Sequence, residues 1–378
     1  MKLTFSRLCG HDHAVAKVRP ADLSLAEKLA EKFEPQIAKA VLDLLQAHGD
    51  MLDMDALLEA LLSGQGDKVL AVVGAAADQA EAMMAGKMKD ALQDAVWAAG
   101  IEALAAPGTA PFIGRAEFHF DRINPALTRW LQEYDLGLIK QISGTTRETI
   151  RDVLVENMRL GQGPIKQAQK IRDAIGLTTR QANAIGNFRK ELETFHLKRS
   201  AASWGLGQQI DRVNGRQVFK PGIDGDPKDG ILNRRLRDFR YDAALAKAQA
   251  TKKPLTPAQI DKMVAAYKRK YLQFRSRTIA RTESLRATNT GIQEAFRQAI
   301  EKGLLSEDLV RRRWVVAADE RLCEVCAPVP GMNPPQGVKF AQPFATPVGP
   351  VMLPPLHPNC RCTTWIQTIE PPKPVNPA

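Results

Sequence analysis

The sequence predicts a mostly α-helical protein with a small β-containing, metal-clipped module near its C-terminal end, an α+β arrangement. Two observations lead to this prediction. Apolar residues recur at three- and four-residue steps through most of the chain, which is typical of helices that bury one face. Four of the five cysteines fall between Cys323 and Cys362, where short β-like stretches replace the helical pattern.

The length of 378 residues is enough for two or three domains, and the composition of 44% hydrophobic and 25% charged residues is ordinary for a chain that buries cores. The longest apolar run, Val69–Ala77, is far shorter than the roughly 20 residues that cross a bilayer. No apolar segment follows the first basic residues, so we expect no secretory signal. The predicted protein has no membrane segment and remains in the compartment where it is made.

The net charge of +11 is unevenly distributed along the chain. The first 120 residues contain 11 Lys/Arg and 17 Asp/Glu, whereas the remaining residues contain 42 Lys/Arg and 25 Asp/Glu. An acidic first part and a strongly basic remainder suggest different neighbours for each. Nucleic acid is one candidate for the basic part, because Lys and Arg replace the counterions that condense on phosphates. A solvated basic surface is the alternative.

An acidic helical region is predicted over residues 1–110. Leucines and other apolar residues form a stripe between residues 23 and 45, and two further helical stretches follow at 51–62 and 68–104. Prolines at both ends of 107–111 then interrupt the pattern, which indicates a domain boundary.

A basic helical domain is predicted over residues 111–310. Thr145, three residues before a glutamate, has the pattern of a capping box and is predicted to begin a helix. The Gly-Gln-Gly-Pro sequence at 161–164 is a turn, the next helix ends at Gly176, and Thr178 begins a third helix with another capping box. Helix, turn, helix is a pattern of DNA-binding regulators, but helical hairpins that pack on one another produce it more often.

An irregular insertion rich in glycine and aspartate interrupts this domain near residues 201–257, with a short strand predicted at 217–219. Helices are predicted over 233–249 and from Pro257 to about Lys302, and the last of these is the most basic element of the chain. Five of its basic residues are the predicted contacts with nucleic acid or a partner protein: Lys268, Arg269, Lys270, Arg275 and Arg277.

A small β module with a Cys/His cluster is predicted over residues 311–370, followed by a proline-rich tail at 371–378. Residues 313–318 and 363–367 have the composition of strands. Ten prolines lie between residues 327 and 358, in the loop that joins the strands. Such a loop has little core of its own and costs chain entropy to close, and a metal ion at its base would offset that cost.

The cluster has the spacing of a structural zinc site. Cys323 and Cys326 form a C-x2-C turn, and after thirty intervening residues His357 and Cys360 form a second turn of the same kind. Cys362 lies two residues further on, so either the histidine or this last cysteine could be the fourth ligand. Ligation by four side chains leaves no open position, which predicts a structural role for the zinc. Two disulfides, or reduced buried thiols, are the alternatives.

The C-terminal third combines several short motifs that point to one known family. They are Ile279–Glu283, Ala287-x-Asn289-x-Gly291, Trp314, Asp319 and the two cysteine-containing motifs. Together they resemble the head morphogenesis proteins of the phage Mu F-like family, over about residues 145–368. Four helix residues belong to the motif: Arg281, Thr282, Glu283 and Asn289. Arg281 and Glu283, two apart on a helix, do not face each other, so each is expected to find its own partner, with the zinc module as the expected place.

The resemblance implies a minor capsid component that acts in head assembly at the portal vertex and is not an enzyme. Its implied partners are the portal protein, other head proteins and, without sequence preference, the packaged DNA. Its implied location is the capsid interior near the portal vertex, with the host cytoplasm as its location during assembly.

Two other classes of function stand beside this one. A metal-dependent nuclease of phage origin could be built on a Cys/His scaffold, but it would need a general-base histidine besides the one that binds zinc. Only His357 of the six histidines lies near the four clustered cysteines in the sequence. A DNA-binding regulator is supported only by the helix–turn–helix pattern.

Overall fold

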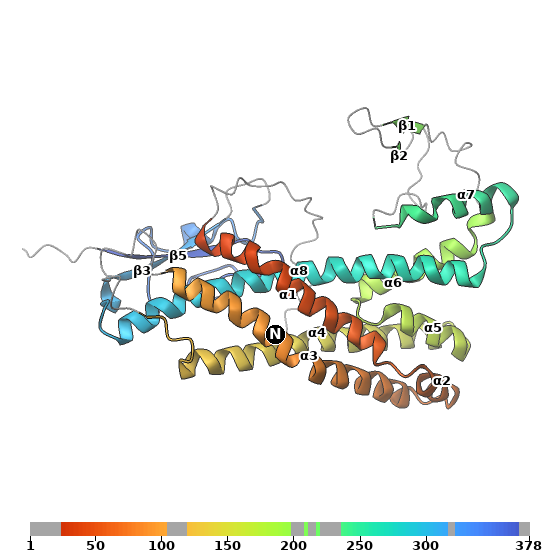
Figure 1. Ribbon diagram of the computed structural model, residues 1–378, viewed down its shortest axis with the longest axis horizontal. Helices are drawn as coiled ribbons and strands as arrows, with labels where there is room; N and C mark the ends of the chain where they lie inside the picture. Colours follow the sequence, from red (N-terminus) through yellow and green to blue (C-terminus); the bar gives the residue numbers. More distant parts are fainter. Residues whose placement is uncertain are drawn as a thin grey trace, which may run out of the picture. The chain divides into compact units, whose positions relative to one another are not determined.

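The computed structural model describes residues 24–103, 119–197, 208–210, 217–219, 236–316 and 322–369. They form a mostly α-helical protein with a small antiparallel sheet near the C-terminal end, which confirms the predicted fold class (Figure 1). The helices are α1 (Leu25–Asp50), α2 (Met54–Leu62), α3 (Gly66–Ala103), α4 (Pro125–Arg159), α5 (Pro164–Ala174), α6 (Thr179–Glu193), α7 (Asp242–Thr251) and α8 (Pro257–Glu301). The strands are β1 (Gln208–Ile210), β2 (Gln217–Phe219), β3 (Val310–Val315), β4 (Val338–Lys339) and β5 (Thr363–Thr368).

Three of the features predicted from the sequence lie outside the described residues. They are the proline break at 107–111, the motif residue Asp319 and the tail at 371–378. Among the described helices, none is both long and apolar enough to span a membrane.

The chain divides into two compact units. Unit 1 comprises residues 1–43, 83–139 and 276–378, and unit 2 comprises residues 44–82 and 140–275. Each unit therefore combines stretches that are distant in the sequence. The regions predicted from composition and from the proline and glycine breaks are, in contrast, consecutive along the chain.

The three N-terminal helices begin and end close to the predicted bounds because their ends carry local signals. Ser24 and Glu27 form reciprocal hydrogen bonds at the start of α1, with Glu27 N donating to the Ser24 hydroxyl over 3.2 Å and Ser24 N donating to the Glu27 carboxylate over 2.9 Å. At the start of α2, the Asp53 carboxylate accepts hydrogen bonds from two backbone N–H groups.

The predicted helix start at Thr145 is wrong. Helix α4 begins twenty residues earlier, at Pro125, and Thr145 lies in its interior. The Thr145 hydroxyl donates to the carbonyl of Gln141, four residues back, over 3.0 Å. A threonine can satisfy its hydroxyl in this way inside a helix, so the capping-box pattern alone does not distinguish an end from a middle.

The predicted punctuation after α4 is confirmed. Gly161 has a positive φ of 60°, and Pro164 is the first residue of α5. Gly176 follows α5 with a φ of 80°, where a Cβ atom would lie 2.7 Å from the carbonyl oxygen of Leu45. Thr178 then caps α6 with the expected capping box. Two positions in this stretch thus need glycine for its left-handed backbone.

The predicted insertion contains the expected strand. Strands β1 and β2 pair in antiparallel orientation, with Gln209 opposite Val218. The helix predicted to start at residue 233 begins at Asp242, after a 3-10 turn over Phe239–Tyr241. The start is displaced because the Asp238 carboxylate accepts a hydrogen bond from the backbone of Arg240, which favours the tighter turn.

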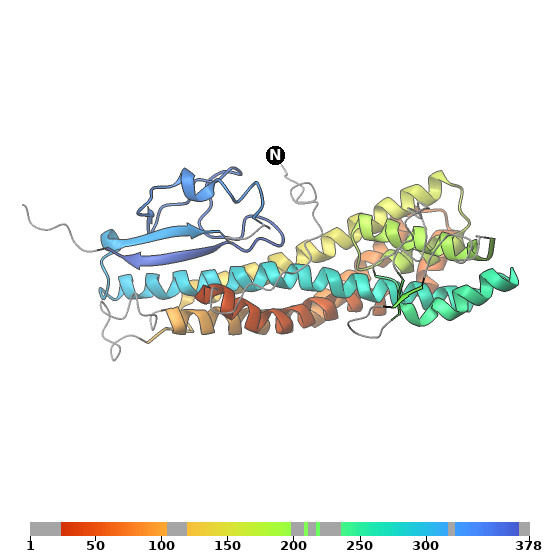
Figure 2. The same cartoon turned by 90° about the horizontal axis from the view of Figure 1, so that it is seen from above.

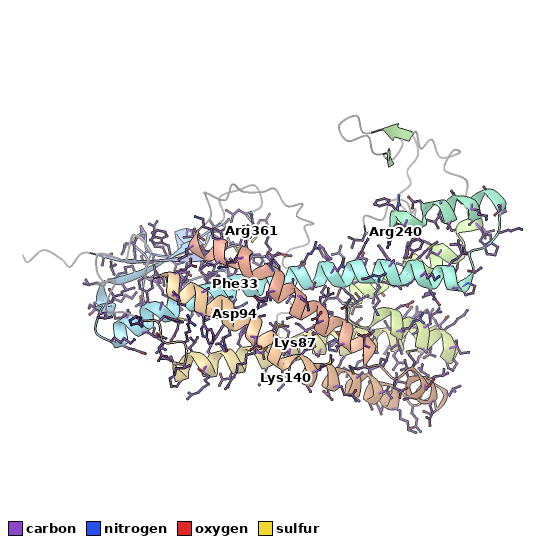
Figure 3. All side chains as sticks on the ribbon, viewed as in Figure 1. Phe33, Lys87, Asp94, Lys140, Arg240 and Arg361 are labelled. Carbon is purple, nitrogen blue, oxygen red and sulfur yellow. The ribbon has the colours of Figure 1, made fainter. Side chains whose placement is uncertain are left out.

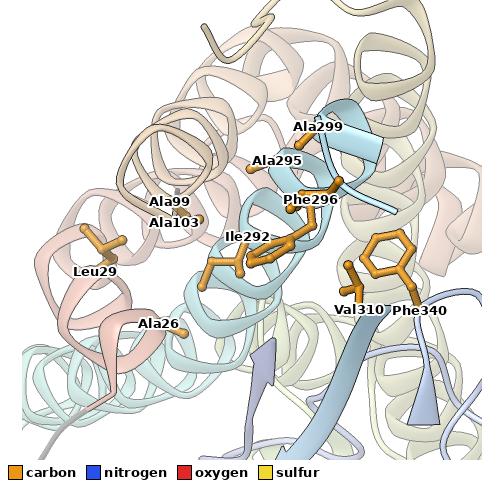
Figure 4. Close-up of a cluster of buried hydrophobic side chains, with 11 residues drawn as sticks. Ala26, Leu29, Ala99, Ala103, Ile292, Ala295, Phe296, Ala299, Val310 and Phe340 are labelled. Atoms are coloured by element: carbon orange, nitrogen blue, oxygen red, sulfur yellow. The ribbon is translucent and has the colours of Figure 1, made fainter. Parts of the chain in front are cut away.

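The C-terminal sheet has the order β4-β3-β5 and is antiparallel throughout. Its paired strands β3 and β5 lie alongside the C-terminal part of α8 (Figure 2). Phe296 of α8, Val310 of β3 and Phe340 share one buried apolar cluster with residues of α1 and α3 (Figure 4). The strands predicted at both ends of the proline-rich loop are thereby confirmed.

Close helix packing supports this core within unit 1. Gly291 of α8 faces α3, where a Cβ atom would lie 2.2 Å from the carbonyl oxygen of Val96, so only glycine fits. Phe33 of α1 packs against the same apolar cluster, and Asp94 of α3 accepts a hydrogen bond from Gln36 of α1 over 3.0 Å (Figure 3). The family-motif glycine is therefore a packing residue.

Candidate metal centre

The two predicted cysteine turns meet in the structure. The Nε2 atom of His357 lies 3.0 Å from the sulfur of Cys323 and 3.2 Å from the sulfur of Cys326, and the sulfurs of Cys326 and Cys360 are 3.7 Å apart. The ligand atoms form two overlapping groups, Cys323–Cys326–His357 and Cys326–Cys360–Cys362, each within 4.8 Å. Cys326 belongs to both groups. All five predicted metal ligands therefore lie in one cluster.

These distances fit a tetrahedral metal ion. With metal–sulfur bonds of about 2.3 Å and metal–nitrogen bonds of about 2.0 Å, two sulfurs in such a site are about 3.8 Å apart and a sulfur and a nitrogen are about 3.5 Å apart. The 3.7 Å between Cys326 and Cys360 matches the first value, and the two contacts of His357 are somewhat shorter than the second. A disulfide would need about 2.0 Å between sulfurs, and all four of these cysteines are free thiols.

The histidine has the tautomer that a metal ligand needs. Its Nδ1 atom donates to the backbone carbonyl of Pro358 over 2.9 Å, which leaves the Nε2 lone pair directed at the sulfurs. The side chain is 6% exposed. His357 is thus oriented by the same turn that carries it.

Charge in the cluster also favours a cation. Hydrogen bonds from Cys326 and Cys362 lower the pKa of the Cys360 thiol, whereas the hydrogen bond with Cys360 raises the pKa of the Cys326 thiol. The three sulfurs are almost completely buried and can accommodate one negative charge among them. Further thiolates need a positive ion at the centre, so this donor set could hold a metal.

Backbone turns present the ligands. Cys326 N and Ala327 N both donate to the carbonyl of Cys323, and Cys360 N donates to the carbonyl of His357 over 3.1 Å. Asn359 lies between the last two with a left-handed φ of 61°. An asparagine tolerates that conformation better than most residues, which explains its place in the His-Pro-Asn-Cys sequence.

The proline-rich loop does have a small core, which sequence reasoning missed. The ring of Trp314 packs edge-on against Phe344, with 5.2 Å between ring centroids. Both belong to a buried cluster that also includes these residues: Cys326, Val329, Val338, Leu356, Cys360 and Cys362. The candidate metal centre is therefore one side of an apolar cluster.

Two family-motif residues of α8 attach this module to the helix. The Thr282 hydroxyl accepts a hydrogen bond from the backbone N–H of Asn359 over 3.0 Å. The Asn289 side chain accepts one from the backbone N–H of Thr364 in β5 over 2.9 Å, and donates to the carbonyl of Leu285. The motif spacing of seven residues, two helical turns, places both side chains on one face of α8.

Glu283 has different partners from those predicted. Its carboxylate is 7% exposed, accepts a hydrogen bond from the Tyr134 hydroxyl of α4, and lies 3.5 Å from the Nε atom of Arg286. Burial raises the pKa of Glu283, although Arg286 opposes this. Arg281 is half-buried and interacts with Glu34 of α1. Burial raises the pKa of Glu34, and the positive charge of Arg281 partly opposes this. Within the part of the chain that the structure describes, the partners of these two motif residues thus lie on helices and not in the metal module.

Arg312 is a structural residue that the sequence did not reveal. It is fully buried, donates to the carbonyls of Met352 and Gln342 in the proline-rich loop, and lies with its guanidinium 5.0 Å from the ring centroid of Phe344. Burial lowers its pKa to about 10. It also donates to the side chain of Gln293 on α8 over 3.1 Å. The one signal in the sequence is its position two residues before Trp314, because alternate residues of a strand share a face and an inward tryptophan would place Arg312 inward as well.

The five predicted basic contacts of α8 differ in exposure. Arg275 is 7% exposed and donates to the carbonyl of Gly176 over 2.7 Å, so it cannot lie on a binding surface. Burial lowers its pKa to about 10. Lys268 and Lys270 are half-buried and donate to backbone carbonyls. Arg269 and Arg277 are exposed.

The fold and the cluster together define a helical protein with a small module that is suited to a structural metal. Residues 245–365, from α7 to β5, match the family described as Phage Mu protein F like protein. This match confirms the resemblance predicted from the sequence and supports a Mu F-like head morphogenesis protein, although it begins at residue 245 and not near residue 145. No curated protein and no solved structure matches the chain.

Proposed function

We propose that this protein is a minor component of the phage head that acts in capsid assembly at the portal vertex. One observation carries the proposal: within the stretch that matches the family, the motif residues Thr282 and Asn289 of α8 accept hydrogen bonds from the backbone of the module that contains the Cys/His cluster. The side chains of Thr282 and Asn289 thus attach the module to α8. A protein whose motif residues build an interface suits assembly better than turnover.

The proposed partners are the portal protein and other head proteins, with packaged DNA as a contact that has no sequence preference. The proposed location is the capsid interior near the portal vertex, and the host cytoplasm before assembly is complete. The basic character of the chain after residue 120 supports a phosphate-rich neighbour.

The metal we propose is zinc, in a structural role. Cys323, Cys326, His357 and Cys360 would hold it, and Cys362 stands next to them as the alternative fourth ligand. Zinc would supply the charge that neutralises buried thiolates and would close the proline-rich loop. With four protein ligands it has no open position for a substrate or an activated water.

A metal-dependent nuclease is the competing class of function. Glu283, the carboxylate in the family motif, is bound to Tyr134 and Arg286. Of the histidines that the structure describes, His357 is the one in contact with the cysteines, and a zinc ligand cannot also serve as general base. These contacts favour the assembly protein.

The deciding experiment quantifies the polypeptide in purified virions against the major capsid protein, and compares heads made with and without it. We expect a few copies for each virion, and heads that package poorly or are malformed when it is missing. Absence from virions together with normal heads would overturn the proposal. Cleavage of plasmid DNA by the purified protein with Mg²⁺ or Mn²⁺, abolished by Glu283→Gln, would favour the nuclease.

A further inference from the structure

The C-terminal sheet has one face that packs inward and one that does not. Along β3, Arg312 and Trp314 point inward and are at most 5% exposed. Arg313 and Val315 alternate with them and are exposed, because successive strand residues point to opposite sides of a sheet. Arg313 and Val315 therefore lie on the outer face of β3.

The register of the three strands shows which residues of β4 and β5 lie on the same outer face as Arg313. Lys339 of β4 pairs with Arg311, which pairs with Gln367 of β5 on its other side. Arg313 pairs with Trp365 of β5. Side chains of paired residues share a face of the sheet. The outer sheet face is thus formed by seven side chains, of which Thr363, opposite Val315, is buried: Lys339, Arg311, Arg313, Val315, Thr363, Trp365 and Gln367.

Three features of this outer sheet face suit a planar, negatively charged ligand. It carries three cations and no acidic side chain. Lys339 and Arg313 are exposed, and Arg311 is half-buried and donates to two backbone carbonyls near the start of β3. Trp365 is 53% exposed, whereas Trp314 on the inner face is 5% exposed. The ring of Trp365 is therefore accessible to a planar ligand.

The geometry brings the ring and the charges together. Residues directly opposite each other on antiparallel strands have Cβ atoms about 5 Å apart. Trp365 therefore stands beside Arg313, and Lys339 stands one strand away on the far side of β3. A flat aromatic surface among cations is the arrangement that binds unpaired bases and their phosphates, since every base offers a face for stacking and each phosphate a negative charge.

We propose that the outer sheet face binds single-stranded nucleic acid, with Trp365 stacking on a base and with Arg313, Arg311 and Lys339 contacting the phosphates. An acidic peptide would satisfy the cations but offers no planar partner for the indole ring. Duplex DNA keeps its bases stacked on each other, so it would use the cations alone. The inference rests on the proposed function in one respect, since it gives the proposed nucleic-acid contact a place and a preferred form. That place is on the sheet and not on α8.

The test uses the full-length, reduced, zinc-loaded protein and a fluorescently labelled oligothymidine, with binding followed by anisotropy at low salt. Arg313→Glu should weaken binding of the single strand about tenfold or more, because it reverses a charge beside the ring. Trp365→Ala should weaken it at least fivefold and leave duplex binding within a factor of two, while Trp365→Phe should retain most of the affinity. Both positions are exposed, and thermal melting verifies that the three variants fold.

Arg269→Glu and Arg277→Glu on α8, alone and together, are the matched charge-reversal controls and should change single-strand affinity less than twofold. Binding that these two variants abolish and the sheet variants leave unchanged would overturn the inference but keep the proposed contact with nucleic acid. No binding of any oligonucleotide would overturn both. Equal loss of single-strand and duplex binding in Trp365→Ala, or full competition by polyglutamate at the same charge concentration, would also overturn the inference.

Discussion

The hydroxyl of Thr282 on α8 accepts a hydrogen bond from the backbone N–H of Asn359, over 3.0 Å, in the turn between His357 and Cys360. Although 77 residues separate them in the sequence, the helix motif and the candidate metal centre are thus in direct contact. The threonine positions the turn that carries two of the predicted ligands. This contact leads to the first prediction.

Thr282→Val keeps the volume of the side chain and removes its hydrogen-bond acceptor. We expect the free energy of unfolding to fall by about 1 kcal/mol and the zinc to be lost at lower chelator concentration, because the turn is held less firmly. Denaturant unfolding and a chelator titration measure the two effects. Thr282→Ser keeps the hydroxyl and should behave like the wild type. A valine variant that retains zinc as the wild type does would show that the turn is held without Thr282.

Cys326 and Cys362 should differ in their importance for the metal. Purified, reduced protein should contain about one zinc ion for each chain by elemental analysis. Cys326→Ser should lose it, because Cys326 belongs to both groups of ligand atoms, whereas Cys362→Ser should retain it if His357 is the fourth ligand. Wild-type protein without zinc and with its thiols paired would contradict the zinc assignment.

Glu283→Ala and Glu283→Gln separate two contributions to the buried cluster around Tyr134. Alanine leaves the Tyr134 hydroxyl and Arg286 without their shared acceptor, so it should lower the free energy of unfolding by about 1–3 kcal/mol. Glutamine still offers an oxygen to Tyr134 and avoids a buried charge, so its cost should be smaller. Thermal melting measures both. Equal losses would mean that the ion pair with Arg286 holds the cluster.

Asp135 should make stability depend on pH. It is 4% exposed, its Oδ1 atom has no hydrogen-bond partner within the described part of the chain, and burial raises its pKa to about 7. Between pH 4 and pH 7 the Asp135 carboxyl keeps its proton in the folded protein, whereas it has lost the proton in the unfolded chain. The free energy of unfolding therefore decreases as the pH rises through this range. Asp135→Asn should therefore gain about 1–3 kcal/mol over the wild type at pH 8 and almost nothing at pH 4. Denaturant unfolding at the two pH values decides, and a gain that does not depend on pH would contradict the assignment.

Arg275 and Arg269, six residues apart on α8, should respond differently to the same substitution. Arg275→Met removes a buried guanidinium and leaves the carbonyl of Gly176 without its donor, which should cost about 1–3 kcal/mol of unfolding free energy. Arg269→Met changes an exposed side chain and should stay within about 0.5 kcal/mol of the wild type. Equal melting temperatures for the two variants would show that Arg275 is not a structural residue.

Much of this protein could be predicted from the sequence because the signals are local. The helices from α1 to α3, the turn at Gly161, the capping box of Thr178 and the strands β3 and β5 all follow from periodicity and from residues at element ends. The cysteine turns are local as well. Two short ligand pairs specify a cluster once the loop between them closes, and the structure brings them together.

Only the tertiary structure decided which of several equivalent side chains is buried and what each one contacts. Three consecutive arginines, Arg311 to Arg313, look alike in the sequence, but the middle one lies inside because β3 turns that face toward α8 and the loop. Arg275 is buried and Arg269 exposed for the same reason: segments about a hundred residues away cover one face of α8. Periodicity determines which residues share a face, and burial depends on which distant segment packs against it, a property of the whole chain that no short window contains.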